Sequence, residues 1–217
     1  MPNQPAAPVP ADLLADWTAL LRRCGAAADP APYGRDLLGR WAEPQRRYHT
    51  TAHLRAVLGH VDVLAAHAGD PDTVRLAAWF HDAVYRPDRS ENEERSAALA
   101  VRALTEAGLS GPRTAEVARL VRLTVSHRPE PGDRDGEVLC DADLAVLGGD
   151  PRAYAAYAAA VREEYAFVPE PDFRAGRADI LRRLLALPAL YRTPLARERF
   201  DAAARANLAA ELDRLEG

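Results

Sequence analysis

Apolar side chains recur along this chain at intervals of three and four residues, the spacing that places them on one face of an α-helix. The first such segment lies between Asp12, a residue suited to capping a helix, and Gly25, a residue suited to ending one. No run of alternating β-branched residues favours a strand. The pattern predicts an all-α protein whose helices cover residues 12–25, 33–41, 50–68, 72–85, 90–107, 112–127, 138–147, 151–161, 172–187 and 194–215.

Proline and capping residues predict where several of these helices begin. Pro112 and Pro151 stand where the first turn of a helix accepts proline. Ser90-x-x-Glu93 has the form of a capping box. The segment RPEPGDRDGE, residues 128–137, is polar and is expected to be a loop.

The predicted helices show no internal repeat and no clear domain boundary between them. The chain has 217 residues, which is enough to bury a sizeable core. One all-α domain is therefore expected over residues 11–217. The Pro-rich start, residues 1–10, is expected to be disordered.

Composition and charge narrow the classes of partner. Apolar residues make up 48% of the chain and charged residues 28%, which is ordinary for a globular protein. The formal net charge is −4, and all 28 basic residues are Arg. A dedicated nucleic-acid binder usually carries a basic excess, so no nucleic-acid partner is expected.

The cysteines and the amino terminus point to a cytoplasmic protein. Cys24 and Cys140 belong to no CxxC pair, and two cysteines in a chain of this length do not make a disulfide framework. The start MPNQPAAPVPADLL lacks the basic and apolar regions of a signal peptide. No stretch approaches the ~20 apolar residues that a membrane-spanning helix needs.

An imidazole and a carboxylate stand side by side in the apolar stretch AWFHDAVY, at His81 and Asp82. Burial of an unpaired carboxylate is so costly that such a group is normally paired or bound to a metal. Neighbours on a helix project ~100° apart, so both side chains reach one ion only if it lies beside the helix. At least one further helix is then needed to complete the ligand set.

Histidines on the predicted helix 50–68 offer more ligands. His53 lies on the apolar face, and His60 and His67 follow at intervals of seven residues, each a rise of ~10.5 Å. The three cannot share one ion, and His60 and His67 are expected to be structural or exposed. His49 lies one turn before His53, and an i, i+4 pair of histidines can share a metal, so this segment offers His53 alone or His49 with His53. Thr50 is suited to cap the helix, which would leave His49 just outside it.

A further carboxylate comes from the stretch LCDADLAVLG. Asp143 lies four residues after Leu139 and four before Leu147, so it projects from an apolar face and needs a cation nearby. Asp141 points roughly to the opposite side and is a possible helix cap, although the spelling DAD leaves it open as an alternative ligand.

The order His53, His81-Asp82, Asp143 on three successive helices resembles the HD superfamily of metal-dependent phosphohydrolases. The resemblance covers roughly residues 46–165. This is the part of the domain that is expected to contain the metal site. Six stretches look like the bacterial group of small predicted HD-superfamily phosphohydrolases: RRYHTTAHL, FHDAVY, NEERSA, TVSH, CDADLAVLG and YAAYAAAVREEY.

This resemblance implies a helical fold and hydrolysis of a phosphate ester, possibly a nucleotide. It assigns His53, His81, Asp82 and Asp143 as metal ligands. Two imidazoles and two carboxylates leave open positions on the ion, where bound water loses a proton more readily than in bulk. Mixed nitrogen and oxygen ligands suit Mn²⁺, Fe²⁺, Co²⁺, Ni²⁺ or Zn²⁺, and Mg²⁺ is also possible.

Other residues are candidates for proton transfer and substrate binding. Glu93 is the expected acid or base, with the capping-box role as its alternative. His49 and His127 are expected to contact the substrate phosphate or to act as acids. Arg46 and Arg47 are candidates to clamp a phosphate, whose geometry Arg matches.

Two other classes of function remain open at this point. A di-iron oxygenase of the same fold would need extra His ligands, which only His49 and His127 could supply. A non-catalytic module that binds a metal or a nucleotide would keep the pocket without any hydrolysis.

Overall fold

Helices build the whole described part of the protein. The computed structural model describes residues 10–217, and that range contains no strand, which confirms the all-α prediction. The first nine residues, where disorder was expected, lie outside the described range. The elements are α1 Ala11–Arg23, α2 Ala31–Trp41, α3 Thr51–Leu64, α4 Pro71–Phe80, α5 Asn92–Glu106, α6 Gly111–Leu123, α7 Arg134–Leu144, the 3₁₀ turn η1 Ala145–Gly148, α8 Pro151–Glu164, α9 Glu170–Leu185 and α10 Pro194–Glu216.

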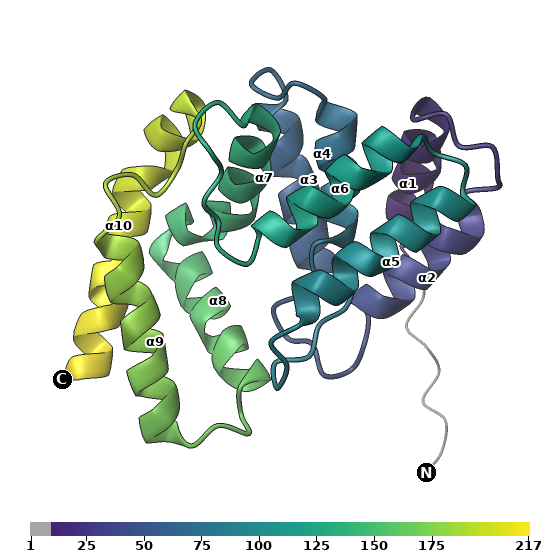
Figure 1. Cartoon of the computed structure of the whole chain (residues 1–217). Coiled ribbons are helices and arrows are strands. Elements are labelled where there is room, and N and C mark those ends of the chain that lie inside the picture. Colours follow the sequence, from purple (N-terminus) through teal and green to yellow (C-terminus); the bar gives the residue numbers. More distant parts are fainter. Residues whose placement is uncertain (1–9) are drawn as a thin grey trace, which may run out of the picture.

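Three helices, α3, α4 and α7, pack on one another at the centre of the molecule. Figure 1 shows the pair α5 and α6 to one side of them and the pair α9 and α10 to the other. One cluster of buried apolar side chains draws on helices from α1 to α10. Within it the indoles of Trp17 and Trp41 donate hydrogen bonds to the carbonyls of Pro30 and Trp79, so burial leaves neither N–H without a partner.

The ends of two central helices are set by side-chain caps. Thr50 caps α3 by accepting a hydrogen bond from the amide of Ala52, as predicted. Asp133 caps α7 by accepting one from the amide of Gly136. The cap lets α7 begin inside the segment 128–137, so the prediction of a loop over all of that segment was wrong in its last part.

Two predicted caps are absent from the helices concerned. Asp12 lies in the first turn of α1 and pairs with Arg55, while Pro10 occupies the cap position. The capping box at Ser90-x-x-Glu93 was also wrong, because α5 has Glu91 at its cap position, without a side-chain cap bond. The turn before α5 is instead held by Asn92, which bonds to the backbone of residues 86 and 89.

Among the helices of residues 10–217, none is both long enough and apolar enough to cross a membrane.

The segment after α7, which contains η1, packs closely against α10 and is hydrogen-bonded to it. Asn207 of α10 donates hydrogen bonds to the carbonyls of Leu147 and Gly149. A side chain at Gly148 would meet the backbone of Phe200, with the nearest backbone atom 2.8 Å from an added Cβ. This close approach fixes the position of the chain that carries Asp143, five residues earlier.

Gly148→Ala is therefore expected to destabilise the protein by about 1–3 kcal/mol, since the clash is with backbone and cannot relax by a rotamer change. Gly59→Ala is the matched control, because its added Cβ meets nothing within 4 Å in an exposed part of α3. It is expected to stabilise by up to about 1 kcal/mol. Urea unfolding of both variants measures the difference, and equal stabilities would contradict the close packing of η1 on α10.

Candidate metal centre

Side chains from three separate segments meet at one point in the core. His53 comes from the first turn of α3, His81 stands at the carboxyl end of α4 with Asp82 directly after it, and Asp143 lies near the end of α7. Both His are buried, and the side chains of Asp82 and Asp143 are 14% and 15% exposed. The three central helices thus position four potential ligands together.

The chain leaves helical geometry immediately after His81. The helix predicted over 72–85 ends at Phe80, so the 100° rule for helical neighbours does not govern Asp82. Arg46 stabilises the turn, because its buried guanidinium donates hydrogen bonds to the carbonyls of Asp82 and Ala83 at 2.9 and 3.4 Å. This turn is what allows an adjacent imidazole and carboxylate to reach the same place.

The spacing of the donor atoms fits a bound cation. Donors ~2.1 Å from a metal lie about 3 Å apart when adjacent and about 4.2 Å apart when opposite. The Nε2 atom of His53 lies 3.1 Å from Asp143 Oδ1 and 3.2 Å from His81 Nε2. Asp82 Oδ2 lies 3.2 Å from His81 Nε2 and 4.0 Å from His53 Nε2. His53, His81 and Asp143 could therefore hold a metal ion. Asp82 lies beside this group, with Oδ2 within 4.0 Å of both His Nε2 atoms.

The tautomer of His81 supports the same conclusion. Its Nδ1 lies 2.7 Å from the carbonyl oxygen of Ala78, which can only accept a hydrogen bond. The Nδ1–H therefore donates, and in the neutral ring the lone pair of Nε2 faces His53 and the carboxylates. A hydrogen bond from the other ring nitrogen is the usual support for a metal-binding His.

The charges of the cluster show how its imidazoles and carboxylates compensate one another. Burial lowers the pKa of His53 below its usual value. Burial has the same effect on His81, but the carboxylates of Asp82 and Asp143 outweigh it and raise the pKa of that imidazole to about 9. Burial opposes ionisation of Asp143, yet the facing imidazoles hold its pKa well below the usual range.

His127 holds the last carboxylate in place. Its Nε2 lies 2.8 Å from Asp143 Oδ2, which leaves Oδ1 directed at His53 and His81. Within residues 10–217, His127 is the one non-glycine residue with positive φ, at 50°. A residue in this region of backbone space carries a conformational cost, and such residues cluster at functional sites.

His49 is held by a carboxylate that the sequence analysis did not single out. Glu164, at the end of α8, accepts hydrogen bonds from the amides of Arg47, Tyr48 and His49 through Oε1. Its Oε2 lies 2.6 Å from His49 Nδ1 and accepts from the hydroxyl of Tyr85. The opposite nitrogen of His49 therefore faces Asp82, at 3.9 Å. The signal was present in the sequence, since Glu164 continues the inward face of α8 seven residues after Tyr157.

The two arginines predicted to bind phosphate have different surroundings. Arg46 is buried, and its donors are taken by Glu43 and by backbone carbonyls, including that of His49. It therefore joins two ligand-bearing segments and does not offer its guanidinium to a substrate. Arg47 is half exposed and lines a cleft of 480 Å³ together with His53 and Asp143.

Glu93 and Asp141 lie apart from the cluster. Glu93 is half-buried in the first turn of α5, and no hydrogen bond or ion pair of the described residues joins it to the four ligands. Asp141 is fully buried and accepts from the amides of Arg192 and Thr193, where α10 begins. Asp141 is thus a structural anchor, and Asp143 is the carboxylate of this helix that faces the imidazoles.

Tyr48 directs a buried hydroxyl toward this region without a protein partner. Its ring lies 4.7 Å from those of His53 and Tyr157, centroid to centroid. Of the side-chain atoms in residues 10–217, its hydroxyl oxygen is one of the few that are buried and unbonded. Such an atom is normally satisfied by water or a ligand, which fits a site that binds one.

The two remaining histidines make contacts outside the cluster. The ring of His60 packs edge-on against Phe200, and His67 pairs with Glu137 at 2.6 Å between Nε2 and Oε2. Neither lies in the cluster.

Comparisons with protein-family models, with curated proteins and with solved structures returned no match to this chain.

The two aspartates of α7 give a direct contrast. Asp143→Ala is expected to abolish metal binding, because it removes a ligand. Asp141→Ala is expected to keep the ion but to lose about 1–3 kcal/mol for each amide left unsatisfied. Elemental analysis and thermal unfolding separate the two effects. Metal retained in Asp143→Ala and lost in Asp141→Ala would show that Asp141, and not Asp143, binds the metal.

Metal affinity is expected to depend on pH through His81. Its pKa of about 9 means that a proton occupies the imidazole at neutral pH, and a metal must displace it. Affinity for Zn²⁺ should therefore rise by about one log unit per pH unit between about pH 6 and 8, and level off above the pKa. Calorimetric titration across this range tests the slope, and a flat profile would contradict a protonated His81.

Proposed function

We propose that this protein is a metal-dependent phosphohydrolase with the HD-type helical fold. The observation that carries the proposal is the meeting of His53, His81, Asp82 and Asp143. These residues were selected as ligands from their order in the sequence, and their Nε2 and Oδ atoms lie 3.1–4.0 Å from one another in five pairs. An ordinary buried His has hydrogen-bond partners of its own but is not surrounded by two carboxylates and a second imidazole.

The donor set suits Mn²⁺, Fe²⁺, Co²⁺, Ni²⁺ or Zn²⁺, because it mixes imidazole nitrogen with carboxylate oxygen. When bound, such an ion supplies an activated water and polarises a phosphoryl oxygen. Asp82 and Asp143 hold the charge that balances the ion. His127 keeps the carboxylate of Asp143 aligned, so the ligands need little reorganisation.

His49 is the residue that we propose moves a proton. Burial raises the pKa of Glu164, but its hydrogen bonds, that to His49 first, outweigh this and lower it to about 2. Glu164 therefore stays ionised and fixes the orientation of the imidazole through Nδ1. In its cationic form the imidazole of His49 carries a second proton on Nε2, which it can donate to the leaving oxygen of a phosphate ester beside Asp82.

Two further groups line the path to the ligands. Arg47 lies in the 480 Å³ cleft and can contact a substrate phosphate. Tyr48 lines the same cleft, and its buried hydroxyl, which has no protein partner, can donate to a water or to a phosphoryl oxygen that reaches it. Glu93 remains a predicted acid or base, with no contact that supports the role.

A screen of phosphate esters tests the function. Purified protein is assayed with p-nitrophenyl phosphate and with nucleoside monophosphates, in Mn²⁺, Co²⁺, Ni²⁺ and Mg²⁺. Hydrolysis that a chelator removes is expected. Metal binding without hydrolysis of any ester would favour the non-catalytic module, and two irons per chain with an oxo-type absorption band would favour the oxygenase.

His49→Ala is expected to lower kcat/KM by about 10²–10⁴ while metal content is unchanged, because the imidazole moves a proton and is not a ligand. Glu164→Gln should lower kcat/KM in the same direction, since Gln cannot orient the imidazole as a carboxylate does. His67→Ala, a surface His, is the control and should keep wild-type activity. Loss of the ion in His49→Ala would contradict its assignment as a proton donor.

A further inference from the structure

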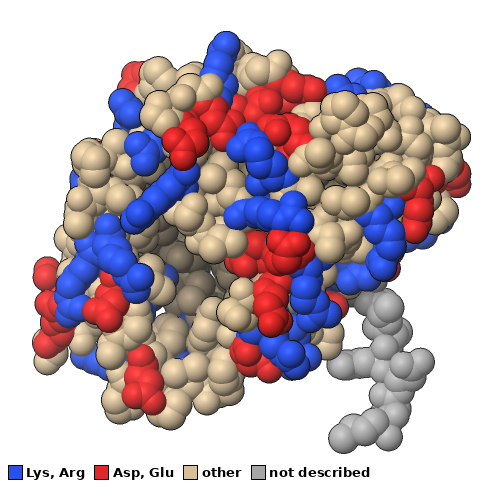
Figure 2. Space-filling view, in the orientation of Figure 1, with Lys and Arg blue, Asp and Glu red and all other residues tan. Residues whose placement is uncertain are grey.

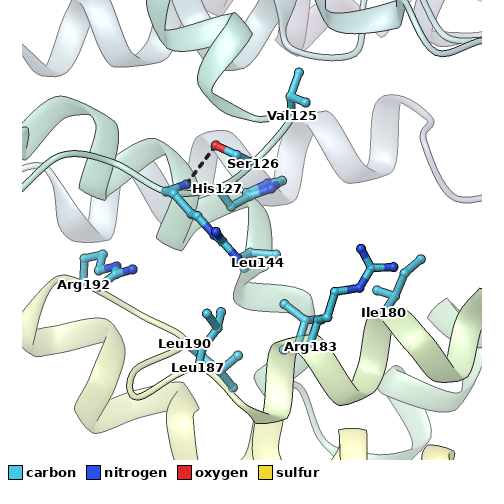
Figure 3. A pocket seen from close by; sticks show the side chains of 11 residues that line it. Val125, Ser126, His127, Leu144, Ile180, Arg183, Leu187, Leu190 and Arg192 are labelled. Atoms are coloured by element: carbon cyan, nitrogen blue, oxygen red, sulfur yellow. Dashed lines mark hydrogen bonds between the residues drawn. The ribbon is translucent and has the colours of Figure 1, made fainter.

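A second cavity is lined by His127, the residue whose imidazole bonds to Asp143. It has a volume of 320 Å³ and lies between the end of α6, the helix α9 and the segment that follows α9. Figure 3 shows His127 on one wall, Arg183 on α9 and Arg192 on the segment beyond it. Arg128 is the third arginine of the lining. We call this cavity the basic pocket.

The charge of the basic pocket is unbalanced. None of its lining residues is acidic, although the whole chain carries a net charge of −4. Within residues 10–217, none of its three guanidinium groups has a carboxylate within 4.0 Å, whereas many other arginines of the protein form ion pairs. Arg183 donates to a backbone carbonyl, that of Asp179. Figure 2 shows a deep hollow on one face of the molecule, with both basic and acidic side chains around its edge.

Apolar side chains form much of the remaining lining. Leu144, Leu184, Leu187 and Leu190 contribute to it, and Ile180 at its edge is 46% exposed. The pocket therefore combines positive charge with an apolar surface. This combination suits an organic anion better than a free inorganic ion.

The basic pocket adjoins the candidate metal centre. His127 lines the pocket, and its imidazole bonds to Asp143. Leu144, the next residue along the chain, also lines it. Ile180 lines both this pocket and the neighbouring cavity of 390 Å³ that contains His49. The pocket is thus one side chain away from Asp143 and shares a wall residue with the cavity of His49.

We infer that the basic pocket binds a second phosphoryl group of the substrate, beyond the one that is hydrolysed. Arg matches phosphate by its planar, bidentate fork, and three unpaired guanidinium groups suit a dianion better than a single carboxylate. The leucines contact the organic part that links the two phosphates. This inference rests on the proposed function and specifies its substrate as a bisphosphate.

Binding of pyrophosphate tests the pocket without any hydrolysis. The full chain is dialysed against a chelator, so that the probe cannot bind through a metal, and titrated by calorimetry. The double variant Arg183→Gln/Arg192→Gln is expected to weaken binding by about tenfold per guanidinium, or ~1.4 kcal/mol each. The control Arg22→Gln/Arg102→Gln makes the same charge change at exposed arginines that line none of the cavities described here. It should keep wild-type affinity.

A kinetic comparison links the pocket to the substrate. With Mn²⁺ present, the double variant should lower kcat/KM for adenosine 3′,5′-bisphosphate and leave hydrolysis of adenosine 5′-monophosphate unchanged. Pyrophosphate binding that is unchanged in the double variant, or equally weak in the control, overturns the inference. Arginine-dependent binding in a protein that hydrolyses no phosphate ester supports the anion site and overturns the phosphohydrolase function instead.

Discussion

The constraint on which this molecule depends is the burial of two carboxylates against two imidazoles. Asp82 and Asp143 lie where charge is costly, and their nearest compensation is the pair His53 and His81. Without a metal ion, the facing charges raise the pKa of His81 and lower the pKa of both carboxylates. A divalent cation could satisfy His53, His81 and Asp143 more completely than a proton, because all three could bind it at once.

The scaffold around this cluster is built to hold its members rigidly. Arg46 and Glu164 fasten the segment before α3, one through backbone carbonyls and the other through backbone amides. Asp141 and Asn207 fasten α7 and η1 to α10. Each fastening residue is a polar group whose bonds are satisfied within the protein, so the ligands gain fixed positions without unpaired groups in the core.

Much of this arrangement could be predicted from the sequence because it follows from local periodicity. The helical class, the cap at Thr50 and the inward faces of His53 and Asp143 all rest on spacing within one segment. Contacts between segments have no such local signature. The pairing of Glu164 with His49, the end of α4 before Asp82 and the arginines of the basic pocket depend on how distant helices pack. Arg46 illustrates the difference. The sequence suggested that it binds a phosphate, whereas in the structure it is buried and donates hydrogen bonds to backbone carbonyls.

X-ray absorption spectroscopy of the zinc-loaded protein tests whether these residues form a metal centre. We expect a first shell of nitrogen and oxygen at about 2.0–2.2 Å, with the outer-shell scattering of two imidazoles. His53→Ala should reduce this to one imidazole or abolish binding. A spectrum with sulfur in the first shell, or without imidazole scattering, would contradict a metal centre formed by His53, His81, Asp82 and Asp143.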